Sequence, residues 1–188
     1  AFSYTYSARL LLREPHKPAR LSAVSSRDFI GLAPVTFANN LKQVALPGSD
    51  EALKSIANRF GSAGLYTGAA ATRQTFLAEA TNARVVHLFT HATADTSHSE
   101  PLLYFADSTL RLSDLGDEGL TNTQLAVLAA CKTAVGANQQ GEGVFSLARG
   151  FAALGVPSVL TTLWSVENKA TYDITNRFYQ YAADGLSK

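Results

Sequence analysis

The sequence predicts an α/β fold with a mostly parallel central sheet. Short apolar runs at 85–90 and 125–130 are typical of strands that are buried on both faces of such a sheet. Segments with helical spacing alternate with these runs, which is the order of β-α units. At 188 residues the chain is long enough for a single domain with a full hydrophobic core.

Residues 1–45 form the least regular portion of this predicted domain, which spans residues 1–188. Aromatic residues alternate with small polar ones in Phe2–Tyr6, which indicates a half-buried strand, and Leu21–Ser25 is a second expected strand. Residues 28–45 are ambiguous, and Pro34 argues against one long helix there.

Helices and a short strand are expected next. Ser49 follows a Pro-Gly pair and is the expected N-cap of a helix, while Thr72 is expected to cap a second helix. Leu65–Thr67 lies between them as a short strand. Apolar residues at helical spacing define the buried faces of these helices: Leu53, Ile56, Ala57 and Phe60 in the first, and Phe76, Leu77 and Ala80 in the second.

The second half of the chain repeats this alternation. Strands are expected at 84–90, 102–105, 124–130 and 156–163, with a hairpin that returns through Leu110, and helices at 112–120, 142–154 and 170–183. The apolar faces of the two long helices consist of Val144, Leu147, Ala148 and Phe151, and of Ile174, Phe178 and Tyr181.

Two of the predicted strands end in reactive side chains. His91 follows the run 85–90, and Cys131, the one cysteine of the chain, follows the run 125–130. Ligands of parallel sheets bind outside the carboxyl ends of the strands, so both residues belong at the site edge of one sheet. A thiol needs a base to become a thiolate at neutral pH, and imidazole is the usual partner. The competing interpretation of a lone cysteine is an inert, buried side chain.

Composition and charge exclude several classes of protein. The net charge of +1 gives no electrostatic field for nucleic acid or a membrane surface, and the apolar runs are too short to span a bilayer. One cysteine excludes an internal disulfide and a cysteine-based zinc cage. His87 and His91 are spaced as a metal pair would be on a helix, but their run is strand-like, so His87 is expected in the core. Neither a metal nor another cofactor is expected.

The chain begins without a methionine or a signal peptide. We therefore expect it to be a fragment of a longer chain. The absence of disulfides fits a reduced, cytoplasmic setting.

Four segments together resemble the CHAT domain. The resemblance runs in order from roughly Leu46 to Leu186, through the pattern around His91, then Ala129–Ala134, Gly141–Val144 and Leu163–Val166. The CHAT domain belongs to the caspase-like cysteine peptidases, together with separase, legumain and the gingipains. The resemblance implies a caspase-haemoglobinase-like three-layer sandwich and a bacterial protein, often associated with tetratricopeptide repeats.

The resemblance also implies a His-Cys dyad that hydrolyses peptide bonds. Cys131 would attack the scissile carbonyl, and His91 would protonate the leaving amine and then activate water. The backbone N–H groups of Ala92 and Cys131 would bind the oxyanion. The resemblance implies a protein or peptide as substrate. It also implies a regulatory partner or a tetratricopeptide-repeat region, and activation of the domain by that partner or by flanking regions.

Three further residues are candidates for contact with substrate. In the CHAT family the end of the strand that corresponds to 156–163 lines the peptide groove. The resemblance therefore implies that Trp164 and Ser165 form a groove wall, where the substrate pairs as an added strand. Trp164 could instead pack in the core. Asp95 could orient His91 or line the pocket, and a solvated loop aspartate is the alternative.

The chain departs from the family pattern at three places. Ala92 replaces the glycine that usually follows the histidine, and its N–H can still donate if its backbone conformation is allowed. Lys132 and the pair Glu167-Asn168 stand where acidic residues are common. Ala92 favours one alternative to the peptidase, a catalytically silent CHAT-like binding or scaffold domain. A second alternative is another α/β thiol enzyme, such as an amidase or acyltransferase.

Overall fold

In the part of the chain that the structure describes, five parallel strands form the central sheet, in the order β2-β1-β3-β7-β8. The structure is a computed structural model that describes residues 27–93, 102–115, 119–129, 142–161 and 168–183. The strands of the sheet are β1 (Arg27–Ala33), β2 (Ala63–Thr67), β3 (Ala83–Leu88), β7 (Leu125–Leu128) and β8 (Val159–Thr161). A second sheet is antiparallel and consists of β4 (Ala92–Thr93), β5 (Leu102–Tyr104) and β6 (Thr109–Arg111).

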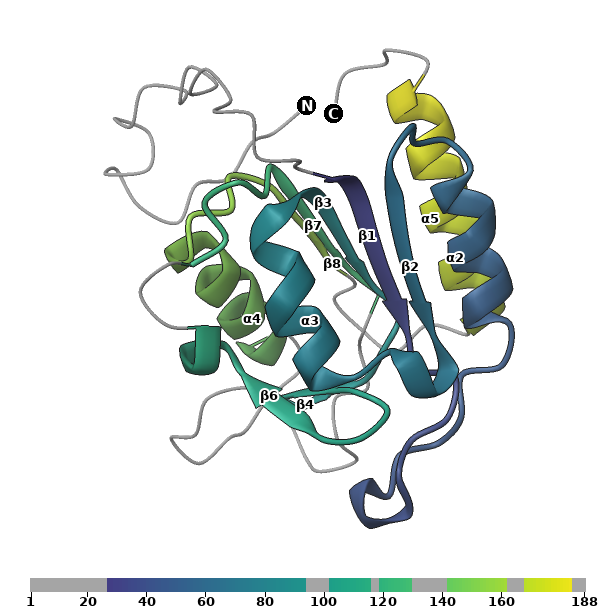
Figure 1. Cartoon of the computed structure of the whole chain (residues 1–188), viewed down its shortest axis with the longest axis vertical. Coiled ribbons are helices and arrows are strands. Elements are labelled where there is room, and N and C mark those ends of the chain that lie inside the picture. The colour runs from purple at the N-terminus through teal and green to yellow at the C-terminus, as the bar shows by residue number, and fades with distance from the viewer. Residues whose placement is uncertain (1–26, 94–101, 116–118, 130–141, 162–167, 184–188) are drawn as a thin grey trace.

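Helices cover both faces of the parallel sheet (Figure 1). α3 (Arg73–Glu79) and α4 (Glu142–Ala153) lie on one face, and α2 (Ser49–Ala57) and α5 (Asn168–Ala183) lie on the other. Because both faces are shielded from water, the inner strand β7 is a continuous apolar run and its neighbour β3 is mainly apolar. This three-layer, caspase-like arrangement confirms the predicted fold class.

The strand β1 contributes to the hydrophobic core on both faces of the sheet. Ile30 and Leu32 are buried against the α3 and α4 layer, and Phe29 is buried against α2 and α5. Gly31 lies between Ile30 and Leu32 in the strand, and a Cβ at this position would come within 2.4 Å of Leu53 Cδ1. The absence of a side chain at Gly31 therefore lets α2 approach the sheet closely.

Most of the elements predicted within the described ranges are confirmed. The exceptions begin with β1, most of which lies in the ambiguous segment 28–45, and β4, for which no strand was predicted. The segment 112–120 contributes a short 3-10 helix at Leu112–Leu115. The strands expected at 2–6 and 21–25 fall outside the described residues. Within the described ranges no helix is long and apolar enough to cross a membrane.

One of the two predicted helix caps is confirmed. Thr72 caps α3, since its Oγ1 accepts a hydrogen bond of 3.0 Å from the N–H of Thr75. Ser49 is not the N-cap of α2 but its first helical residue, and Gly48 is the N-cap. Gly48 has a φ of 80°, a conformation that glycine adopts without the steric penalty of a Cβ. The helix therefore begins at Ser49, one residue earlier than an N-cap at Ser49 would place it.

The buried face of α5 was predicted correctly at Phe178 and wrongly at Ile174 and Tyr181. Phe178 is half-buried and packs against the core, whereas Ile174 is 63% exposed and Tyr181 is 52% exposed. The face that packs on the sheet also carries Tyr172, Thr175 and Tyr179. Tyrosine is tolerated inside because Tyr179 OH forms a hydrogen bond of 3.1 Å with Nδ1 of His87.

Candidate active site around His91

His91 lies just beyond the carboxyl end of the central strand β3. That strand pairs with β1 through Leu88 and Leu32 and with β7 through Leu88 and Leu128. The N–H of Phe89 extends the pairing with β1 by donating to the carbonyl of Leu32 at 3.0 Å. His91 is therefore at the sheet edge where ligands of parallel α/β proteins bind, and it is only 5% exposed.

The imidazole of His91 is held by the loop between β1 and α2. Its Nε2 lies 2.8 Å from the carbonyl oxygen of Val44, and its ring lies 5.0 Å, centroid to centroid, from the ring of Phe37. A carbonyl only accepts hydrogen bonds, so Nε2 carries the hydrogen and donates it. In the neutral imidazole the basic nitrogen is consequently Nδ1.

The backbone on either side of His91 is held by β5. The N–H of Tyr104 donates to the carbonyl of His91 at 3.0 Å, and the hydroxyl of Thr90 donates to the carbonyl of Tyr104. The small sheet and the loop 34–48 lie at the same end of the molecule as the carboxyl ends of the parallel strands (Figure 1). They also contact each other, because the N–H of Ala38 donates to the carbonyl of Ala106 at 2.9 Å. His91 is thus fixed by its ring and by its backbone.

Ala92 begins the strand β4 and is paired with Leu103. Since the adjacent residue Tyr104 donates to the carbonyl of His91, this is a non-hydrogen-bonded pair of the ladder. The N–H of Ala92 therefore points away from β5. Among the described residues that are not glycine, positive φ angles occur at Val35 and Lys42 and not at Ala92. The methyl group of Ala92 is accordingly accommodated in an ordinary extended backbone.

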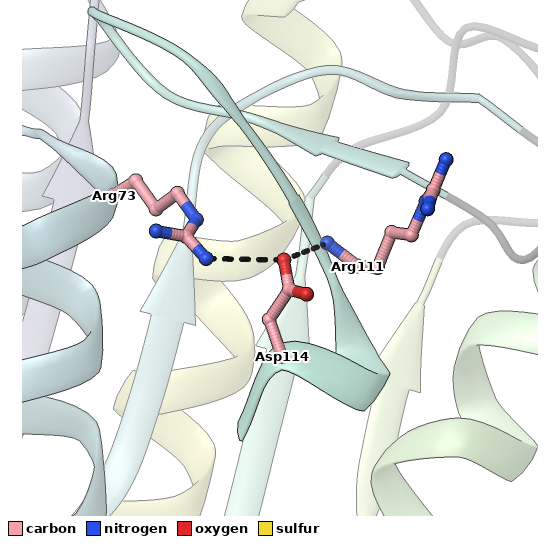
Figure 2. Close-up of polar contacts among 3 residues, drawn as sticks. All are labelled: Arg73, Arg111 and Asp114. Atoms are coloured by element: carbon pink, nitrogen blue, oxygen red, sulfur yellow. Dashed lines mark hydrogen bonds and ion pairs between the residues drawn. The ribbon is translucent and has the colours of Figure 1, made fainter. Parts of the chain in front are cut away.

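An acidic side chain anchors the small sheet to α3. Figure 2 shows Asp114, whose Oδ2 accepts from the N–H of Arg111 at 3.1 Å and pairs with Nη2 of Arg73 at 3.2 Å. The N–H of Arg111 and the guanidinium of Arg73 hold the pKa of Asp114 below its usual value. Asp107 adds a second link, because its Oδ1 accepts from the backbone N–H of Arg73 at 3.0 Å. Both links are exposed to solvent.

His87, which lies within β3, is fully buried under α5, as predicted. Burial lowers the pKa of His87 to about 3, so its ring is neutral at physiological pH. Its centroid lies 4.2 Å from that of Phe89 and 6.2 Å from that of Phe29, and its Nδ1 lies near Tyr179 OH. This environment is that of a core histidine. Among the described residues there is also no cluster of three or more His, Cys, Asp or Glu side chains that could hold a metal ion.

The remaining predicted site residues fall outside the described part of the chain. These residues are Cys131, Trp164, Ser165 and Asp95. The last described residue before the cysteine is Ala129, whose N–H donates to the carbonyl of Leu88 at 3.0 Å. The pairing of β7 with β3 therefore extends one residue past Leu128, toward the end of the sheet at which His91 lies.

No sequence pattern marks the groups that hold His91. Val44 acts through its carbonyl, which every residue possesses, and Phe37 lies in the ambiguous segment 28–45. Thr90 and Tyr104 are joined only by the pairing of β4 with β5, so their contact could not be read from either segment alone.

The sequence model of the CHAT domain matches residues 1–188, the whole chain. The chain belongs to the CHAT domain family. That family is caspase-like, in agreement with the parallel sheet and its two helical layers. None of the curated proteins matches the sequence, so no activity is inferred from a characterised relative.

Proposed function

We propose that this CHAT domain is a cysteine endopeptidase that uses Cys131 as nucleophile and His91 as acid and base. The observation that carries the proposal is the fixed imidazole of His91 at the carboxyl edge of β3. An imidazole whose Nε2 donates to a carbonyl has Nδ1 as its basic nitrogen, and a basic imidazole nitrogen is what a thiol nucleophile requires.

The register of the sheet supports the pairing of these two residues. Leu88 and Leu128 are direct partners in the β3–β7 ladder. His91 follows the first of them by the same number of residues as Cys131 follows the second. Cys131 is two residues beyond Ala129, a length of chain that spans at most about 7 Å. This short connection supports the proposed pairing of the thiol with His91.

The proposed reaction proceeds in two halves. His91 Nδ1 first takes the thiol proton of Cys131. Cys131 Sγ then attacks the scissile carbonyl carbon, the carbonyl electrons move onto oxygen, and the intermediate collapses with loss of the amine, which takes that proton from His91. His91 then takes a proton from water, and the hydroxide attacks the thioester to release the thiolate and a carboxylic acid, which loses its proton to solvent. The bond from Nε2 to the Val44 carbonyl keeps the ring oriented through both halves.

Two backbone N–H groups are proposed to bind the oxyanion, those of Ala92 and Cys131. The N–H of Ala92 points away from β5, so the ladder does not consume it. Ala92 favoured a silent scaffold domain because a glycine is usual at its position. Its ordinary backbone conformation supports the oxyanion role, since alanine can supply the same donor without strain.

The substrate is proposed to be an extended segment of protein or peptide that pairs as an added strand. Trp164 and Ser165 would form a wall of its groove, and Asp95 would line the pocket or orient His91. Activation by flanking regions or by a partner, such as a tetratricopeptide-repeat region, belongs to the same proposal, as does a bacterial, cytoplasmic setting.

The experiment is a proteomic cleavage-site screen in which wild-type protein, Cys131→Ala and His91→Ala are incubated with the same lysate. New N-termini that appear with the wild type and are absent with both variants support the proposal. New N-termini that persist with either variant contradict the dyad, because residues of one catalytic unit are each indispensable. Circular dichroism of each variant verifies that the fold is retained.

A further inference from the structure

Thr90, which directly precedes His91, is tied to the small sheet by its side chain. Its hydroxyl donates to the carbonyl of Tyr104, and the N–H of the same Tyr104 donates to the carbonyl of His91 at 3.0 Å. The carbonyl of Tyr104 is therefore bonded to Thr90, and its N–H is bonded to the next residue, His91. Thr90 is 2% exposed, so this arrangement is shielded from water that could replace it.

The hydroxyl of Thr90 stands in for a main-chain donor. If the antiparallel ladder continued past Ala92, the carbonyl of Tyr104 would accept from the N–H of the opposite residue, His91. Instead β4 begins at Ala92, and the Thr90 hydroxyl donates to that carbonyl. The chain can therefore leave the ladder at His91 without leaving a buried carbonyl unsatisfied. This departure brings the imidazole to Val44 and Phe37.

We propose that Thr90 is a positioning residue for His91: its hydroxyl fixes the peptide that presents the imidazole. The inference rests on the proposed role of His91 as acid and base. The bond from Thr90 defines the direction of the chain before His91, and the bond from Tyr104 defines it after. Without the hydroxyl, the backbone at 90–91 gains a conformational choice, and Nδ1 is in the productive position for less of the time.

The test compares Thr90→Val, which keeps the shape and removes the hydroxyl, with Thr90→Ser, which keeps the hydroxyl. The matched control is Thr123→Val. Thr123 is 1% exposed, and its hydroxyl donates to the carbonyl of Ala83 at 3.0 Å and to that of Ala80 at 3.3 Å, at the opposite edge of the sheet. This control loses an equivalent buried hydrogen bond far from His91. Thr90→Ala replaces Thr90→Val if the valine variant does not fold.

Two readouts are taken on folded protein: kcat and KM on a peptide from the cleavage screen, and the rate at which iodoacetamide alkylates Cys131 at mildly acidic pH. We expect Thr90→Val to lower kcat at least about ten-fold with little change in KM, because a small misplacement of a catalytic group affects the chemical step. Its alkylation should slow as well. Thr90→Ser and Thr123→Val should stay within about three-fold of wild type in both readouts.

Three results would overturn the inference. They are wild-type values for Thr90→Val, equal losses in Thr90→Val and Thr123→Val, or an equal loss in Thr90→Ser. His91→Ala is measured alongside to separate this inference from the proposed function. If His91→Ala keeps wild-type turnover, the proposed function itself fails. If His91→Ala is inactive while Thr90→Val is normal, the role of Thr90 alone fails.

Discussion

The buried histidine of β3 predicts a specific loss of stability at acidic pH. Burial lowers the pKa of His87 from 6.5 to about 3 in the folded protein, so the folded state keeps the ring neutral while the unfolded chain protonates it. Where the unfolded state binds more protons, stability rises with pH. The contribution of His87 is therefore fully present above pH 6.5 and is lost as the pH falls from 6.5 toward about 3.

The magnitude follows from the size of this pKa shift. Each pH unit below 6.5 removes about 1.36 kcal/mol from the free energy of unfolding until the folded-state pKa is reached. At about pH 5 the loss is therefore about 2 kcal/mol, a substantial fraction of the total stability of a typical domain. The carboxylate of Asp114, whose pKa lies below its usual value, is still ionised there and does not contribute to this window.

Urea unfolding followed by circular dichroism measures this effect in wild type and in His87→Gln at about pH 7.5 and about pH 5. The glutamine variant loses stability at both pH values through altered packing, but it should lack the additional decrease of about 2 kcal/mol. Tyr179→Phe is the control, since it removes the partner of Nδ1 and leaves the imidazole buried. It should be less stable at both pH values by a similar amount. Parallel pH dependences of wild type and His87→Gln would refute the reasoning.

Three further predictions concern the close packing of α2, the anchor of the small sheet and the residue after His91. Gly31→Ala should lower the free energy of unfolding by about 1–3 kcal/mol, because its Cβ would overlap the fully buried Leu53. In a Leu53→Ala background the loss caused by Gly31→Ala should be smaller, and full additivity of the two losses would contradict the contact. Asp114→Asn should cost less than about 1 kcal/mol by urea unfolding, since its pair with Arg73 is exposed, and a larger loss would show that the anchor is essential. Ala92→Gly should change kcat/KM by less than about three-fold, because the alanine is unstrained; strong activation would instead favour a domain silenced at that position.

The elements that the sequence located well carry their signal locally. β7 is an uninterrupted apolar run and β3 is a mainly apolar one, and the hydrogen bond that caps α3 joins two residues of one helical turn, Thr72 and Thr75. β1 was not located because glycine at 31 weakens the strand pattern, and the reason for that glycine is Leu53 on another element. A close approach of this kind depends on tertiary packing, which the local sequence pattern of a strand does not reveal.

The helix face of α5 and the surroundings of His91 show the same limit. Tyr179 is inside because His87, far away in the chain, offers its OH a partner, whereas Ile174 is outside despite its hydrophobicity. His91 itself was found from its place after an apolar strand. The Val44 carbonyl that orients its ring has no side-chain signature, so it could emerge only from the geometry of the loop.

The central claim, that His91 activates Cys131, is tested most directly by the reactivity of the thiol. The chain contains one cysteine, so iodoacetamide labelling followed by mass spectrometry reports on Cys131 alone. An imidazolium beside the sulfur favours the thiolate, so wild-type protein should react faster at about pH 6 than an unstructured cysteine peptide does. His91→Ala should react about ten-fold more slowly than wild type. Equal rates in the folded wild type and in His91→Ala would contradict the dyad.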